Sequence, residues 1–217
     1  MHVLLKRAVS VIMAAALVFG GIVITNRQEK EVQAAGSYKL VWSDEFNGTQ
    51  LDRNNWNVEV NGYGGWNNEL QYYCDSPENI EVSDGTLKLR ALKKQYQGKE
   101  YTSARLNTQN KVTVHHGRIE ARIKLPKFMG AFPAFWMMGA NGLTWPKCGE
   151  IDIMEAVNNE SVIYGTAHWA CDYTSNEEGY DSNGSSTSAA GINIDITQWH
   201  TYGVEWTADR ITWYVDD

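Results

Sequence analysis

Short runs rich in β-branched and aromatic residues recur from Tyr38 onward, and no long segment repeats apolar residues with the period of a helix. Gly, Asn, Asp and Ser separate these runs, as turn residues separate the strands of a sheet. Ser83-Asp84-Gly85 and Ala208-Asp209 predict hairpin turns. The pattern indicates an all-β sandwich. We expect strands over residues 39–43, 79–82, 86–91, 104–109, 112–114, 117–124, 134–139, 150–156, 161–169, 201–206 and 210–215.

The expected strand over residues 150–156 carries three carboxylates in an otherwise apolar run. Side chains alternate between the two faces of a strand, so Glu150 and Asp152 point the same way, whereas Glu155 would point to the opposite face. One extra residue in a β-bulge restores the phase, and Ile153-Met154 is the natural place for it. We therefore predict that all three carboxylates share one face, with Ile151 and one of Ile153 and Met154 facing the core.

The simpler interpretation of this strand is a half-buried edge strand with a wet acidic face. However, three carboxylates on one face repel each other and cost stability, which favours a functional use. Two glutamates with a third carboxylate beside them are the groups that glycosidic bond cleavage requires.

The first 34 residues have the features of a secretory signal peptide. Lys6-Arg7 is a basic start, an apolar stretch covers residues 8–25, and Val32-Gln33-Ala34 offers small residues for cleavage. The apolar stretch is also close to the length of an uncleaved membrane anchor. We expect a secreted, extracellular protein, held at the cell surface if this segment is retained.

The charge of the remaining domain, residues 35–217, narrows the classes of molecule that it is suited to bind. Residues 1–34 hold four basic and two acidic residues, so the remainder carries 15 basic and 24 acidic residues, a net charge of −9. Such a charge argues against nucleic acid as a partner, and a neutral polysaccharide fits better than an acidic one. We expect one domain and a monomer, without stable membrane association once the signal is removed.

Cys74, Cys148 and Cys171 make an odd number of cysteines, which allows at most one disulfide and leaves one free thiol. No spacing suits a zinc site, and we favour three unpaired cysteines. Residues 181–190 are rich in Ser, Asn, Gly and Ala, and we expect them to form a loop. Residues 211–217 run from a strand into a turn with no partner strand after it, so we expect a domain truncated at its C-terminus.

The carboxylate strand and the residues before it, Trp145-Pro146-Lys147-Cys148-Gly149 followed by Glu-Ile-Asp-Ile-Met-Glu, resemble the signature of glycoside hydrolase family 16. The extra bulge residue resembles the laminarinase (endo-1,3-β-glucanase) branch rather than the licheninases, which have the shorter Glu-x-Asp-x-Glu. The resemblance extends from about Lys39 to the end. It implies a jelly roll of two antiparallel sheets with a concave substrate cleft, of the concanavalin A-like type.

The resemblance also implies catalytic roles. Glu150 would be the nucleophile and Glu155 the acid and base of a retaining, endo-acting hydrolysis. Asp152 would hold a proton or hydrogen bond that keeps the pKa values of the two glutamates apart. No cofactor is expected for catalysis.

Several residues match positions that bind sugar in the family. Trp136 and Trp145 would line the subsites, and Phe132 replaces a Trp that many laminarinases carry before Pro133. Asn68 would bind a sugar hydroxyl, although composition alone indicates only a turn around it.

Two further residues and a metal site have open interpretations. Arg105 is either a solvated Arg or a residue that binds hydroxyls and steadies the nucleophile. His168 is either a structural His or a support for substrate or acid–base chemistry. The resemblance also implies a structural calcium ion at Glu45 and the backbone of Gly85, without a dense Asp/Asn loop to support it.

Alternative functions remain open at this stage. A glucan-recognition module on the same fold would bind without cutting, although such relatives usually lack one or both glutamates. Another substrate of the same enzyme class, such as mixed-linkage 1,3-1,4-glucan, agar, carrageenan or xyloglucan, is a second alternative. We favour 1,3-β-glucan, since sulfated galactans call for more basic site residues than the sequence offers.

Overall fold

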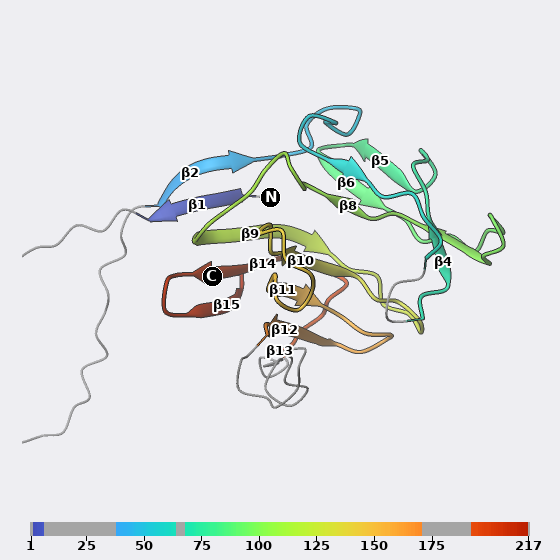
Figure 1. Cartoon of the computed structure of the whole chain (residues 1–217). Coiled ribbons are helices and arrows are strands. Elements are labelled where there is room, and N and C mark those ends of the chain that lie inside the picture. Colours follow the sequence, from blue (N-terminus) through green and yellow to red (C-terminus); the bar gives the residue numbers. More distant parts are fainter. Residues whose placement is uncertain (1, 7–37, 64–67, 171–191, 217) are drawn as a thin grey trace, which may run out of the picture.

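A computed structural model of the chain describes residues 2–6, 38–63, 68–170 and 192–216, and every regular element in these ranges is a β-strand (Figure 1). Most strands belong to two sheets stacked on one another, with three short ribbons beside them. The described residues include no helix that is long and apolar enough to cross a membrane. The expectation of an all-β sandwich is therefore confirmed.

The larger sheet is antiparallel, and its five strands lie in the order β15-β14-β9-β1-β2. Its central pair is unbroken, because Trp199 pairs with Lys124 at one end and Trp206 with Gly117 at the other. The strands are β15 (Ile211–Val215), β14 (Trp199–Trp206), β9 (Gly117–Lys124), β1 (His2–Lys6) and β2 (Tyr38–Ser43).

The strand β1 lies within the segment expected to be a signal peptide. It pairs with both β2 and β9 and so fills the space between them. Residues 7–34 of that segment lie outside the described residues, and the signal peptide stays a prediction.

The smaller sheet has the order β10-β11-β12-β13 and carries the three carboxylates on its second strand. Its strands are β10 (Ala134–Met138), β11 (Glu150–Glu155), β12 (Val162–His168) and β13 (Ile192–Asn193). Apolar side chains from β9, β11, β12 and β14 fill the space between the two sheets, where burial of apolar surface stabilises the fold. The central buried residues are Ile119, Leu125, Ile153, Met154, Ala156, Ile163, Ile196, Tyr202 and Val204.

Three two-stranded ribbons extend the structure on one side (Figure 1). They are β3 (Asn57–Val58) with β8 (Leu106–Asn107), β4 (Gln71–Tyr73) with β7 (Tyr101–Ser103), and β5 (Ile80–Ser83) with β6 (Thr86–Leu89). A second small core of Leu51, Trp56, Ile80 and Val82 packs against residues of β3, β6 and β8. In the predicted hairpin, Ser83 pairs with Thr86, and Asp84 and Gly85 both have positive φ, as a two-residue type I′ turn requires.

Two expected strands depart furthest from the structure, whereas most of the others differ by one or two residues at their ends. Residues 112–114 form no strand, because Lys111 and Val112 both donate to the carbonyl of Thr108 and Thr108 donates back to the carbonyl of Val112, which closes a turn. Of residues 104–109, only Leu106–Asn107 are paired. The loop expected over residues 181–190 lies outside the described residues.

Candidate active site

A β-bulge in β11 brings Glu155 into phase with the other two carboxylates. Asp152 pairs with Thr166 and Glu155 pairs with Tyr164, so two residues of β11 stand opposite Gly165 alone. The predicted bulge at Ile153-Met154 is confirmed. Both bulge residues are buried in the core, Ile153 at 3% and Met154 at 1% exposure, which corrects the expectation that only one of them faces it. The extra residue turns both apolar side chains inward.

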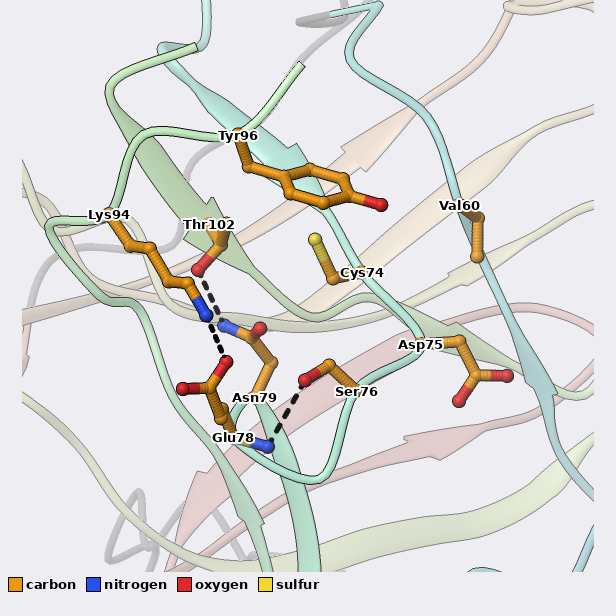
Figure 2. A pocket seen from close by; sticks show the side chains of 9 residues that line it. All are labelled: Val60, Cys74, Asp75, Ser76, Glu78, Asn79, Lys94, Tyr96 and Thr102. Atoms are coloured by element: carbon orange, nitrogen blue, oxygen red, sulfur yellow. Dashed lines mark hydrogen bonds and ion pairs between the residues drawn. The ribbon is translucent and has the colours of Figure 1, made fainter.

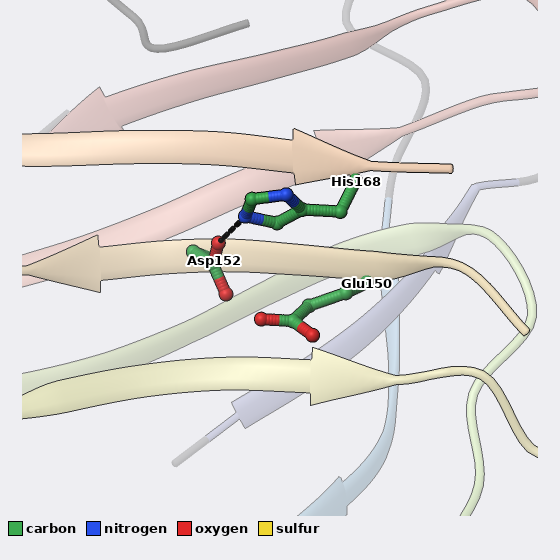
Figure 3. Close-up of side chains that lie close together, drawn as sticks. All are labelled: Glu150, Asp152 and His168. Atoms are coloured by element: carbon green, nitrogen blue, oxygen red, sulfur yellow. Dashed lines mark ion pairs between the residues drawn. The ribbon is translucent and has the colours of Figure 1, made fainter. Parts of the chain in front are cut away.

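Glu150, Asp152 and His168 lie close together on the same face of the smaller sheet (Figure 3). One ligand atom from each of the three lies within 4.8 Å of the others. Glu150 and His168 are directly paired across β11 and β12. Nε2 of His168 lies 3.2 Å from Oδ2 of Asp152. This is an ion-pair distance, although Oδ2 of Asp152 has no partner in hydrogen-bonding geometry among the described residues.

The environment of Asp152 holds its carboxyl group in the protonated form. Burial, the negative charges of Glu150 and Glu155, and a hydrogen bond with Glu150 together raise the pKa of Asp152 to about 9, with burial the largest cause. A protonated Asp152 is a hydrogen-bond donor, which an ionised one is not. It can therefore stabilise negative charge on Glu150.

Glu155 also favours its protonated form. Burial raises the pKa of Glu155, and the negative charge of Glu150 adds to this effect. A carboxyl group whose pKa is raised holds its proton to higher pH, as general acid catalysis requires. The strand therefore presents Glu150 beside two carboxyl groups whose environments favour the protonated form.

Trp136 and Arg105 form a second part of the site, next to the carboxylates. Trp136 on β10 is paired with Asp152 on β11. The guanidinium carbon of Arg105 lies 4.8 Å from the centre of the Trp136 ring, and Nε of Arg105 lies 3.0 Å from a carboxylate oxygen of Glu59. Arg105 is therefore held in place and is not a freely solvated side chain.

Trp145 lies beside His168. Its ring centre is 5.9 Å from that of His168, and the residue is 44% exposed. An exposed aromatic face beside a carboxylate pair is a suitable surface for stacking a sugar ring. Phe132 is exposed as well. Asn68 is exposed in the loop before β4, with a φ of 55°, and no described contact ties it to the carboxylates.

A polar cluster near Arg105 was not predicted. The carboxylate of Glu69 accepts hydrogen bonds from Nε2 of Gln71 at 2.5 Å and from the hydroxyl of Tyr73 at 2.7 Å. Burial and the hydrogen bond to Glu69 raise the pKa of Tyr73 to about 12, against the opposing charge of Arg105. Glu59 also belongs to this group. No local pattern marks these residues, since β3, β4, β7 and β8 are two or three residues long.

The residues expected to bind calcium offer few ligands. Glu45 is exposed, and Oδ1 of Asn47 lies 3.8 Å from the position that a Cβ atom on Gly85 would take. These groups supply oxygen atoms of the kind that calcium prefers. In the described ranges, three His, Cys, Asp or Glu ligands come together only at Glu150, Asp152 and His168. Calcium at this place would combine the Glu45 carboxylate with the backbone carbonyl of Gly85 and the amide oxygen of Asn47, and it stays a prediction.

Of the three cysteines, Cys74 is buried and Cys148 half-buried, and both are free thiols. Cys171 lies outside the described residues, so the expectation of three unpaired cysteines is tested only in part.

A cavity of about 300 Å³ lies away from the carboxylates, between residues 74–79 and residues 94–102 (Figure 2). Its polar groups already bind one another. Lys94 pairs with Glu78, and Nδ2 of Asn79 donates to the hydroxyl of Thr102 at 3.1 Å. Because these groups are satisfied and no catalytic group lines the space, the carboxylate face of β11 is the stronger candidate site.

Comparison with known proteins gives one family and several close structures. A sequence profile described as "Glycosyl hydrolases family 16" matches residues 67–217. The curated protein "Beta-glucanase" from Rhodothermus marinus is 40% identical over 192 residues, which cover 84% of this chain and 64% of that protein. "Glucan endo-1,3-beta-glucosidase A1" from Niallia circulans is 35% identical over 201 residues, which cover 84% of this chain and 29% of that protein.

Among solved structures, the laminarinase from Rhodothermus marinus superposes with a TM-score of 0.74 at 40% identity, covering 82% of this chain and 72% of that one. The chain thus spans less than two thirds of the length of the two curated relatives.

Proposed function

The chain belongs to glycosyl hydrolase family 16 and has its jelly-roll β-sandwich fold, and from this premise we propose that it is a retaining, endo-acting β-glucanase that hydrolyses 1,3-β-D-glucosidic linkages. The observation that carries the proposal is the set of three carboxylates that the β11 bulge places on one face. In that set, burial and neighbouring charge favour the protonated forms of Asp152 and Glu155.

The proposed reaction has two steps, and both depend on the raised pKa of Glu155, which favours its protonated form. Glu150 attacks the anomeric carbon, the bond to the leaving oxygen breaks, and Glu155 gives that oxygen a proton. Glu155, now ionised, then takes a proton from water. The water oxygen attacks the anomeric carbon and releases Glu150, which restores both groups and retains the configuration.

Asp152 and His168 support the nucleophile in this scheme. A protonated Asp152 donates a hydrogen bond to Glu150 in the resting enzyme. As Glu150 loses its negative charge in the covalent intermediate, the pKa of Asp152 falls, and the adjacent His168 is placed to interact with the resulting carboxylate.

The choice of 1,3-β-glucan rests on the relatives. Their names include a β-glucanase, a glucan endo-1,3-β-glucosidase and a laminarinase. Trp136 is paired with Asp152, and the Trp145 ring lies 5.9 Å from that of His168. Both rings would stack on sugar rings, with Arg105 and Asn68 binding hydroxyls. A neutral glucan also suits the acidic composition of the chain.

We also propose that the enzyme acts outside the cell as a monomer. The basic start and apolar stretch of residues 1–34 support export. Calcium at Glu45 and Gly85 would have a structural role, since these residues lie on a different part of the chain from β11.

The test is an assay of purified protein on laminarin, barley mixed-linkage glucan and agarose, with Glu150→Gln as the inactive control. Release of reducing ends from laminarin that disappears in the variant would support both the nucleophile and the substrate. Activity on another polymer alone would keep the chemistry and reject the 1,3-glucan assignment. Binding to laminarin without cleavage by the unaltered protein would favour a glucan-recognition module instead.

A further inference from the structure

We propose that Trp213, on the opposite sheet, is a positioning residue that holds the β11 bulge and thereby sets the place of Asp152 and Glu155. The proposal rests on the proposed function, because it assigns Trp213 to the same carboxylate site. Trp213 itself touches no reacting atom in this scheme and acts through the backbone of β11.

The contact that carries the proposal is a hydrogen bond between the two sheets. Nε1 of Trp213 donates to the main-chain carbonyl of Asp152 at 2.8 Å. Trp213 lies on β15, where it pairs with Val204 of β14, and its ring packs against the core between the sheets. The bond therefore ties a strand of the larger sheet to the catalytic strand of the smaller one.

The bonded carbonyl lies where the bulge begins. It precedes Ile153 and Met154, the two residues that stand opposite Gly165, and Glu155 follows them. In a bulge the regular ladder is interrupted, so the orientation of the peptide at its start depends on contacts from outside the sheet. Fixing the carbonyl of Asp152 fixes the direction in which the chain continues to Glu155.

Because Gly165 has no side chain, the indole ring of Trp213 can lie against the backbone of β12. A Cβ atom on this residue would lie 2.4 Å from Cδ1 and 2.6 Å from Nε1 of Trp213, which is far too close. The ring edge that carries the donor therefore lies directly against the backbone of β12, at the one residue that faces the bulge. Trp213, Gly165 and the bulge form one packed unit.

The first test compares Trp213→Phe with the matched control Trp199→Phe. The first variant keeps an aromatic ring and removes the donor, and the second makes the same change at an exposed tryptophan of β14 that lies under Arg122. For Trp213→Phe we expect kcat on the cleaved glucan to fall about 10- to 100-fold, as small misplacements of catalytic groups do. KM should stay within about two-fold of wild type.

The pH profile separates positioning from simple support of the fold. If the bulge loosens, Glu155 is less buried and the basic limb of the kcat profile moves to lower pH. The control should keep the wild-type profile. A Trp213→Phe variant that melts at a lower temperature but keeps wild-type kcat and its basic limb would overturn the proposal.

A second measurement uses the unaltered protein and needs no activity. The indole N–H of Trp213, assigned by through-bond NMR, should shift with pH in step with the ¹³C-carboxyl signals of Asp152 and Glu155. An indole signal that stays constant while those carboxyl groups titrate would overturn the proposal, even if Trp213→Phe fails to fold. Failure of glucan cleavage by wild type would reject the proposed function and leave this NMR result interpretable.

Discussion

The Nε2 atom of His168 lies 3.2 Å from Oδ2 of Asp152, and the two residues reach this contact from neighbouring strands of the smaller sheet. Asp152 is almost completely buried, at 2% exposure, and also interacts with Glu150. Asp152 thus connects the proposed nucleophile to a group that can carry positive charge.

Replacing Asp152 with Asn tests this connection. Asn has nearly the same shape and can donate to Glu150, but it cannot give up a proton as the charge on Glu150 changes. We expect kcat to fall about 10- to 100-fold, less than the loss in Glu150→Gln, because supporting interactions contribute less than the nucleophile. Steady-state kinetics of the two variants on the same glucan give the comparison, and equal losses would contradict the supporting role.

The same variant should change how stability depends on pH. The pKa of Asp152 is about 9 in the folded protein and about 4 in an unfolded chain. The folded state binds the extra proton between these values, so this contribution to stability is complete below about pH 4 and is lost as the pH rises towards 9.

Asp152→Asn has no such proton to lose. Its melting temperature should therefore rise relative to that of wild type as the pH goes from 5 to 9. Thermal scans of both proteins over this range test the sign. A constant difference between the two melting curves would show that the carboxyl group does not carry the proton.

Glu155→Gln should separate the two steps of the reaction. Without the acid, we expect the rate on a glucan to fall by about 10²- to 10⁴-fold. An aryl β-glucoside with a good leaving group needs no proton, so formation of the covalent intermediate should survive. Added azide should then release a β-glycosyl azide, identified by NMR, whereas an α-azide would place the nucleophile at residue 155 instead.

Arg105→Lys keeps the charge and removes the planar group that lies over Trp136. Because cation–π contacts contribute about 0.5–2 kcal/mol and Lys does not reproduce the planar geometry of Arg, we expect KM to rise about three- to ten-fold with little change in kcat. Arg122→Lys is the matched control, since Arg122 lies 5.0 Å from the Trp199 ring on a different sheet. An equal rise in both variants would reject a site-specific role.

Met154→Ala tests the burial of the second bulge residue. Met154 is 1% exposed, and removing a fully buried side chain of this size costs about 2–5 kcal/mol of unfolding free energy. Met129→Ala, at a residue that is 72% exposed, should leave stability almost unchanged. Urea unfolding of both variants measures the difference, and a loss below about 1 kcal/mol at Met154 would argue against its packed position.

The bulge and its carboxylates were predictable because their signal is local. The alternation of apolar and polar residues predicts a strand over residues 117–124, which are the observed limits of β9. Three carboxylates within six residues indicate both the strand β11 and its bulge. The hairpin at Ser83-Asp84-Gly85 is likewise specified by its own residues. These elements needed no knowledge of distant partners.

The surroundings of the site depend on contacts between distant segments. Arg105 is held by Glu59 and Trp136, from two other strands or their flanks, and Trp213 reaches Asp152 across the core. The ribbon strands around Glu59 and Glu69 are too short to show a period, so they form only because partners far along the chain pair with them.

Because β11 carries one extra residue at its bulge, the number of residues in this segment matters more than the choice of apolar side chains. An exchange of one apolar side chain for another between Asp152 and Glu155 leaves the parity of the strand intact. The insertion or deletion of one residue there would reverse that parity, sending Glu155 into the sandwich interior and an apolar group towards water. An exchange of similar apolar side chains therefore keeps the carboxylates on one face, whereas a change in residue count does not.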